Sequence, residues 1–272
     1  WLTILILTKK RLAEMRVVIK VGTSTLTYPT GNLNIHRVEK LCKVISDIKN
    51  AGNEVILVTS GATGMGVGKI GLLKRPDDMP TKQAMAAIGQ CELMYTYDKL
   101  FSEYNHVVAQ VLVTKSDIDN EKHRRNFNNT LTRLLELNVI PIINENDSVA
   151  TEEFFIGEND SLAAIIAVNI KADLVILLTD IDGLYTSDPR SDKNAKLISE
   201  VTEITPEILA VAGGSNSKFG TGGMITKVNA AKIAMEAGCD LIVASGADPD
   251  VLYDIVDGKN VGTRFVSGGA VK

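Results

Sequence analysis

From Met15 onward the chain alternates short runs of apolar, mostly β-branched residues with longer amphipathic segments. Several of the short runs are apolar at every position, which is typical of parallel strands that are buried on both faces. The runs that we predict as strands are 17–21, 55–59, 107–113, 139–143, 174–179 and 241–244. Strands that alternate with helices in this way predict an α/β fold built on a mainly parallel sheet.

The longer segments carry apolar residues at helical spacing. Between the first two predicted strands this spacing runs from Ile35 to Ile48, and Gly52 then ends the helix. We interpret the apolar side chains of this helix as core, namely Ile35, Val38, Leu41, Cys42, Ile45 and Ile48. Similar helices are predicted over 81–101, 124–137, 161–170 and 225–237.

Composition limits the function. The 272 residues carry a formal net charge of −4 and no cluster of lysine and arginine, which argues against a nucleic-acid partner. Three widely spaced cysteines without a C-x-x-C pair are typical of reduced thiols in the cytosol. No segment is long and apolar enough to span a membrane, so we predict a cytoplasmic protein with no membrane partner.

Residues 1–14 fall outside the alternating pattern. Their apolar residues precede their basic ones, which is the reverse of the order in a signal peptide. We interpret 1–14 as a non-native or disordered extension, with an extra edge strand as the alternative. The protein proper then begins near Met15, and its length allows one large α/β domain or two small ones.

A lysine lies near the end of the first predicted strand. A buried lysine is costly unless it meets an anion, and Gly22 would let the backbone approach the anion beside Lys20 closely. A lysine that merely reaches out to solvent at the sheet edge is the alternative.

A glycine-rich run over 59–68 follows the second predicted strand. It offers N–H groups and the Ser60 hydroxyl, which suit a phosphate or a carboxylate at the start of a helix. Gly66, Gly68 and Gly71 match the G-x-G-x-x-G pattern of dinucleotide sites, but they lie well past the strand end. A nicotinamide-dependent oxidoreductase is therefore the weaker alternative.

Two runs of carboxamides and carboxylates come next, Asn-Glu-Asn-Asp at 144–147 and Gly-Glu-Asn-Asp at 157–160. Side chains of both kinds together suit a ligand with an ammonium and a carboxylate group, which an amino acid has. A metal ion and a pair of surface turns are the alternatives. The second run places Asp160 or Ser161 at the N-cap of the helix predicted over 161–170.

Two further loops have features of a nucleotide site. Thr179 and Asp180 follow an apolar strand, and the glycine-rich segment 220–227 opens a helix whose first turn carries Lys227. Glycine N–H groups and a lysine at a helix start suit a phosphate group. A mobile surface loop is the alternative for 220–227.

Taken in order, these motifs resemble those of the amino-acid kinase family. The matching runs are Val-Ile-Lys-Val-Gly-Thr at 18–23, Thr-Ser-Gly-Ala at 59–62, the runs at 144–147 and 157–160, Leu-Thr-Asp at 178–180 with Gly-Leu-Tyr at 183–185, and Thr-Gly-Gly-Met at 221–224 with Thr-Lys at 226–227. The resemblance implies a three-layer α/β/α sandwich over 15–272. It places the acceptor at the N-terminal half and ATP at the C-terminal half of one sheet edge.

The runs at 144–147 and 221–224 resemble one branch of that family. Its members use ATP and Mg²⁺ to phosphorylate the γ-carboxylate of L-glutamate, which is the first step of proline biosynthesis. The resemblance implies that Lys20 and Lys227 grip the transferred phosphoryl group and that Asp160 orients them. It also implies that the protein supplies few direct Mg²⁺ ligands.

The same resemblance implies two sets of binding residues. Glutamate would be bound by Ser60, Asn144, Asp147 and Asn159. ATP would be bound by Lys20, Gly22, Thr179, Asp180, Thr221, Gly222, Gly223, Met224, Ile225, Thr226 and Lys227.

The resemblance further implies proline as a feedback inhibitor, a homo-oligomer, and transient contact with glutamyl phosphate reductase. Two features depart from the family pattern: Glu158 stands where many members have Asp, and we expect no PUA domain after the kinase domain. The alternatives are a non-catalytic amino-acid sensor on the same scaffold and a kinase whose acceptor is aspartate or acetylglutamate.

Overall fold

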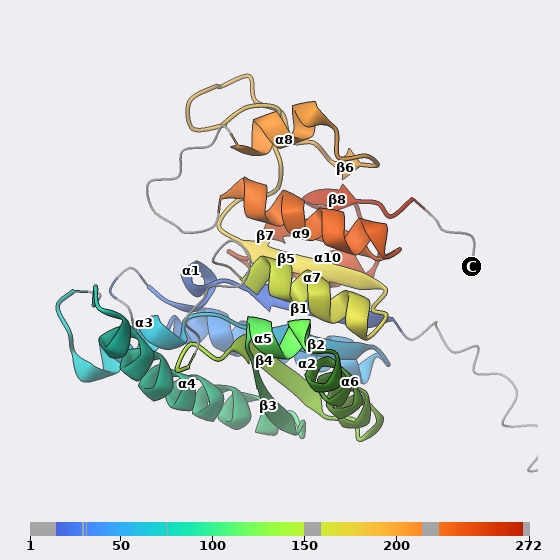
Figure 1. Cartoon of the computed structure of the whole chain (residues 1–272). Coiled ribbons are helices and arrows are strands. Elements are labelled where there is room, and N and C mark those ends of the chain that lie inside the picture. The colour runs from blue at the N-terminus through green and yellow to red at the C-terminus, as the bar shows by residue number, and fades with distance from the viewer. Residues whose placement is uncertain are drawn as a thin grey trace, which may run out of the picture.

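The computed structural model describes residues 15–28, 30, 32–74, 76–149, 159–213 and 223–268. Its strands are β1 (Arg16–Val21), β2 (Glu54–Val58), β3 (Val108–Val113), β4 (Ile140–Glu145), β5 (Leu174–Thr179), β6 (Glu200–Val201), β7 (Asp240–Ser245) and β8 (Thr263–Phe265). They form one eight-stranded sheet in the order β3-β4-β2-β1-β5-β7-β8-β6 (Figure 1). Neighbouring strands are parallel except for β7 and β8, so the mainly parallel sheet is confirmed.

Helices cover both faces of this sheet (Figure 1). They are α1 (Thr23–Leu26), α2 (Ile35–Asn50), α3 (Ala62–Ile70), α4 (Met79–Ser102), α5 (Lys115–Asp119), α6 (Glu121–Glu136), α7 (Asn159–Asn169), α8 (Pro206–Gly213), α9 (Met224–Glu236) and α10 (Val251–Val256). None of the helices within the described ranges is long and apolar enough to cross a membrane.

The core consists of two hydrophobic clusters, one on each side of the sheet. Side chains alternate between faces along a strand, so Val18 packs with α5 to α9, while Val17 and Ile19 pack with α1 to α4 and α10. The predicted three-layer α/β/α sandwich is therefore confirmed.

The longer predicted elements are present. The six predicted strands correspond to β1 to β5 and β7, and the five predicted helices correspond to α2, α4, α6, α7 and α9, with small shifts at their ends. One core prediction is wrong, because Ile35 is 61% exposed. It is the first residue of α2, whereas the other five apolar residues of that prediction lie further along the helix and are buried.

The glycine-rich run over 59–68 after β2 is mostly helix, and this helix is not among those predicted from the sequence. Helix α3 begins directly after Gly61, whose φ of 99° is in the left-handed region that favours glycine. Gly66 and Gly68 lie inside α3, and Gly71 is its C-cap. The three glycines therefore do not form the turn between strand and helix that a dinucleotide site requires.

Helices α3 and α4 cross with their backbones in contact. A Cβ atom at Gly66 would lie 1.9 Å from the carbonyl oxygen of Met85, and one at Gly89 would lie 1.7 Å from that of Ala62. No side chain fits at either distance, so this crossing requires glycine on both helices.

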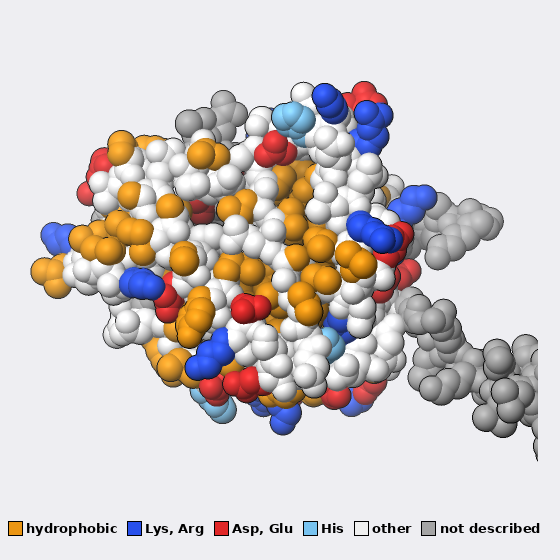
Figure 2. Space-filling model, turned by 90° about the horizontal axis from the view of Figure 1, so that it is seen from below, with side chains coloured by type: hydrophobic (Ala, Val, Ile, Leu, Met, Phe, Trp, Pro, Cys, Tyr) orange, Lys and Arg blue, Asp and Glu red, His pale blue; other side chains and the backbone are white. Residues whose placement is uncertain are grey.

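Strand β3 lies at one edge of the sheet and, within the described part of the chain, pairs with β4 alone. Viewed from this side, hydrophobic side chains gather across the middle of the face (Figure 2). Strand β3 contributes half-buried apolar residues here, and the large hydrophobic residue before it, Val107, is exposed.

Candidate active site

Strand β1 carries Lys20 to the carboxyl edge of the sheet, where open α/β sheets bind ligands. Its register with Val58 of β2 and Leu177 of β5 places it in the middle of that edge. Because side chains alternate, Lys20 shares the face of Val18, which is covered by α7 and α9. Only 6% of Lys20 is exposed, which contradicts the alternative of a lysine that reaches out to solvent.

Three charged side chains meet beneath these two helices. Asp160, in the first turn of α7, lies between Lys20 and Lys227, which is in the first turn of α9. Asp160 Oδ1 is 2.7 Å from Lys20 Nζ, and Asp160 Oδ2 is 3.1 Å from Lys227 Nζ. Burial alone would raise the pKa of the Asp160 carboxyl, but the two ammonium charges outweigh this and hold the pKa well below its usual range.

Two ammonium groups share one carboxylate, and all three side chains are buried. Ammonium groups form strong charge-assisted hydrogen bonds to phosphate and carboxylate oxygens, so the arrangement is suited to an anionic ligand. Thr226 adds a hydroxyl, whose single proton can reach either Asp160 Oδ2 at 3.2 Å or the carbonyl oxygen of Gly223 at 2.8 Å.

Helix α7 begins at Asn159, so neither Asp160 nor Ser161 is its N-cap, contrary to the sequence prediction. The helix starts earlier than its apolar pattern indicates. Both Asn159 and Asp160 are buried and have polar partners, and the helix can therefore include two polar residues in its first turn.

Two of the longer helices at this edge begin with glycine at the N-cap, as does the four-residue α1 after Gly22. Gly61 precedes α3 and Gly223 precedes α9, and glycine has no side chain that could accept from the first N–H groups. Four other helices have side-chain caps, from Asn34, Asp78, Thr114 and Asn120. The positive ends of α3 and α9 therefore remain open to an anion at the carboxyl edge.

Carboxamides surround the next part of the site. Asn159, which precedes Asp160, places Nδ2 within hydrogen-bond distance of three acceptors. They are the carbonyl oxygen of Thr59 at 2.5 Å, Ser60 Oγ at 2.9 Å and Asn144 Oδ1 at 2.9 Å. Ser60 and Asn144, two of the predicted acceptor-binding residues, are thus both in direct contact with a third, Asn159.

The carboxamide network extends to Gln90 of helix α4. The helix was predicted from the sequence, but the part that Gln90 takes in the site was not. Asn144 Nδ2 donates to Gln90 Oε1 at 2.9 Å, and Gln90 Nε2 donates to Gln110 Oε1 of β3 at 3.3 Å. Seven residues beyond Gln90, the buried Tyr97 hydroxyl lies 2.9 Å from Thr59 Oγ1. The available signal was a polar side chain at Gln90 within the buried apolar stripe of the helix.

The remaining predicted residues lie at the same edge but outside these contacts. Asp147 is half-buried in the turn after β4. At the end of β5, Thr179 is buried and donates from Oγ1 to Asp180 Oδ1 at 3.1 Å, while Asp180 is exposed. Gly22 is close to Lys20, because a Cβ atom there would lie 3.6 Å from Lys20 Nζ.

The predicted nucleotide-binding residues at the start of α9 fall into two groups, some in the hydrophobic core and others beside the ion pairs. Met224 is buried in the hydrophobic cluster on the α7 side of the sheet, and Ile225 packs against it, so both side chains belong to the core. Gly223, Thr226 and Lys227 lie next to the ion pairs. Thr221, Gly222 and Glu158 lie outside the described residues.

The side chains of the described ranges provide no cluster of three or more His, Cys, Asp or Glu that could hold a metal ion. The central carboxylate, Asp160, has both oxygens occupied by lysines. The donor set is therefore suited to binding anions and does not form a metal cage.

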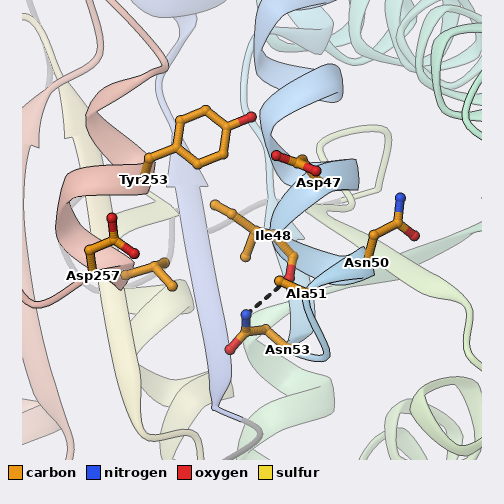
Figure 3. A pocket seen from close by; sticks show the side chains of 8 residues that line it. Asp47, Ile48, Asn50, Ala51, Asn53, Tyr253 and Asp257 are labelled. Carbon is orange, nitrogen blue, oxygen red and sulfur yellow. Dashed lines mark hydrogen bonds between the residues drawn. The ribbon is translucent and has the colours of Figure 1, made fainter. Parts of the chain in front are cut away.

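A pocket of about 330 Å³ lies elsewhere, between the last turn of α2 and helix α10 (Figure 3). It is lined by Asn53, which donates to the carbonyl oxygen of Ile48, and by Asp47, Tyr253 and Asp257. Asn53 directly precedes β2, whereas Ser60 follows it, so the pocket is at the opposite edge of the sheet from the ion pairs.

Comparison with known proteins gives consistent results. The model of the amino acid kinase family matches residues 15–245. A glutamate 5-kinase from Clostridium perfringens is 53% identical over 256 residues, which cover 93% of this chain and 95% of that protein. A glutamate 5-kinase from Listeria innocua is 52% identical over 256 residues, with 93% of each chain covered.

Similarity in fold extends to more distant proteins. The carbamate kinase from Giardia lamblia, solved with AMP-PNP bound, superposes with a TM-score of 0.66 at 19% identity. The match covers 93% of this chain and 99% of that one. At this level of identity the likeness concerns the fold.

Proposed function

The chain belongs to the amino acid kinase family, and we propose that it transfers the γ-phosphoryl group of ATP to the γ-carboxylate of L-glutamate. The product would be L-glutamyl 5-phosphate, the first intermediate of proline biosynthesis. One observation carries the proposal: two buried lysines share a single carboxylate directly beside a cluster of carboxamides. The high identity to proteins named glutamate 5-kinase supports glutamate as the acceptor.

The chemistry needs no general base. A γ-carboxylate oxygen of glutamate is already ionised and attacks the γ-phosphorus of ATP, the bond from that phosphorus to the β,γ-bridging oxygen breaks, and ADP leaves. The protein contributes position and charge neutralisation. In the proposed roles, Lys20 and Lys227 contact the phosphoryl oxygens from two sides, while Asp160 keeps both ammonium groups in place.

The two substrates would occupy two halves of one edge. Ser60, Asn144 and Asn159 would bind glutamate, with Asp147 as the partner of its ammonium group. ATP would lie over the ends of β5 and α9, where Gly22, Thr179, Asp180 and the N–H groups after Gly223 would contact it, together with 221–222. This division into an N-terminal acceptor half and a C-terminal nucleotide half is the one that the family resemblance implied.

The proposed Mg²⁺ would be bound mainly by the phosphate oxygens of ATP, because the described residues form no metal cage. Its chemistry would be to neutralise phosphate charge. No residue of the chain is assigned to it as a ligand.

The test is a hydroxamate assay. The protein is incubated with ATP, Mg²⁺, hydroxylamine and either L-glutamate, L-aspartate or N-acetylglutamate. We expect hydroxamate from glutamate alone, because hydroxylamine traps the acyl phosphate. Absence of product from all three acceptors, with glutamate binding intact, would favour the sensor alternative. Product from aspartate or acetylglutamate in place of glutamate would refute the proposal that glutamate is the acceptor.

Two variants test the lysines in the same assay. Lys20→Ala and Lys227→Ala each remove a positive charge opposite the transferred group, so we expect kcat to fall by about 100-fold or more. Lys43→Ala, at an exposed position of α2, is the control and should retain activity. A change in KM alone would contradict the proposed role in the transition state.

The other partners stay predictions. They are proline as an inhibitor, a homo-oligomer, contact with glutamyl phosphate reductase, and a cytoplasmic location. Proline added to the hydroxamate assay tests the first of these directly.

A further inference from the structure

We infer that Gln90 of α4 is a positioning residue for the acceptor end of the site. It does not reach the ion pairs itself, but it sets the orientation of Asn144, and Asn144 in turn contacts Asn159. The inference rests on the proposed function, since it concerns the glutamate half of that site.

The orientation of the Asn144 carboxamide follows from its neighbours. Asn144 Oδ1 accepts from Asn159 Nδ2 and from the backbone N–H of Glu145, both at 2.9 Å, while its Nδ2 donates to Gln90 Oε1. A flipped carboxamide would point N–H groups at two donors and its oxygen at the Gln90 oxygen. Gln90 therefore provides the acceptor that makes one orientation favourable.

The orientation of Gln90 is determined in the same way. Its Nε2 donates to Gln110 Oε1 on β3, so its own oxygen faces Asn144. Gln90 is 8% exposed and Asn144 is 2% exposed. Water cannot easily replace the bond between them, and its loss would leave an Asn144 donor without this acceptor in the interior.

Helix α4 holds Gln90 in place through the residues on either side. Gly89 fits against the carbonyl oxygen of Ala62 on α3, and Tyr97 bonds to Thr59 at the end of β2. Gln90 and Tyr97 are seven residues apart, which places them on one helix face. The same rigid helix thus contacts the loops after β2 and the end of β4.

The experiment measures KM for glutamate and for ATP in the hydroxamate assay. Gln90→Met keeps the size of the side chain but removes both hydrogen bonds. We expect the glutamate KM to rise about tenfold, as one lost buried hydrogen bond implies, while the ATP KM changes less than about twofold. Gln90→Glu keeps an acceptor oxygen for Asn144 and should be closer to the wild type. Glu92→Gln, which breaks an exposed pair with Lys69, is the matched control on the same helix.

A double-mutant cycle tests whether Gln90 acts by orienting Asn144 or by stabilising the fold in general. If Gln90 acts through Asn144, then adding Gln90→Met to Asn144→Ala should cause no further rise in the glutamate KM. An additive rise would show that Gln90 acts by another route and would overturn the inference.

Two further outcomes are distinguishable. If Gln90→Met does not fold, Gln110→Met removes only the outer hydrogen bond at an exposed position and should raise the glutamate KM by about two- to threefold. An unchanged glutamate KM in Gln110→Met would then overturn the inference. A wild-type protein that forms no glutamyl hydroxamate would instead refute the proposed function.

Discussion

At the scale of single residues, the site depends on how three charges are arranged. Asp160 is ionised in the interior because Lys20 and Lys227 hold it on both sides. Removing the charge of Asp160 would leave two ammonium groups close together without the carboxylate that they share.

Asp160→Asn is expected to lower the free energy of unfolding by about 3 kcal/mol at pH 7, the usual effect of breaking a buried ion pair. It should also lower kcat, because both lysines lose the group that orients them. Denaturant unfolding and the hydroxamate assay measure the two effects. Asp98→Asn, at an exposed position of α4, is the control and should change little.

The same variant has a pH signature. The pKa of Asp160 is lowered by folding, so its contribution to stability is present above its unfolded pKa and is lost as the pH falls toward the folded pKa. The difference in unfolding free energy between wild type and Asp160→Asn should therefore shrink below about pH 4. An equal difference at pH 7 and pH 3 would contradict the ionised state of Asp160.

Individual residues also show the limits of the sequence. Lys20, Asp160 and Lys227 were predicted together because each stands in a recognisable run, and the structure brings them together. Gln90 and Tyr97 stand in no such run. Their partners lie on other elements, and a hydrogen bond between helix and strand leaves no periodic pattern along one helix.

At the scale of elements, length decided what could be predicted. Strands and long helices have enough residues to display a period, whereas α1, α5 and α10 span six residues or fewer. Helix α3 was missed for another reason. Glycine has low helix propensity, so its glycines indicated a loop, but close packing against α4 outweighs that propensity.

The crossing of α3 and α4 can be tested with one methyl group. Gly89→Ala would place Cβ 1.7 Å from the carbonyl oxygen of Ala62, so the helices must move apart. We expect a loss of about 1–3 kcal/mol in the free energy of unfolding and a higher glutamate KM. Gly64→Ala on α3 meets only an ordinary contact at 3.8 Å, so it should be neutral or slightly stabilising. Equal stabilities of the two variants would contradict the crossing.

At the scale of the whole molecule, a single sheet joins the two halves. Strands β1 and β5 are neighbours in the middle, and the helices that carry Asp160 and Lys227 lie on the same face. The sequence predicted this layout because the motifs follow strand ends in order. It did not predict β6 and β8, which are too short to show alternation.

The reactivity of the three cysteines tests whether both faces of the sheet are covered by helices. Cys91 is exposed, whereas Cys42 and Cys239 are buried on opposite sides of the sheet. Burial raises the pKa of the Cys42 thiol, and burial together with Asp240 raises that of Cys239 to about 12. A thiol reagent at pH 8 should label one cysteine rapidly in the native protein and all three in denaturant. Rapid labelling of a second cysteine in the native protein would contradict the layered core.

The contacts of α4 also limit which substitutions such a protein can accept during evolution. Gly89, Gln90 and Tyr97 touch α3, β4 and the end of β2 from one rigid helix, so a shift that suits one contact disturbs the other two. The acceptor end would therefore tolerate substitutions on the exposed side of α4 far more readily than on this face. A new acceptor preference would have to arise through several coordinated replacements, or through side chains that α4 does not touch.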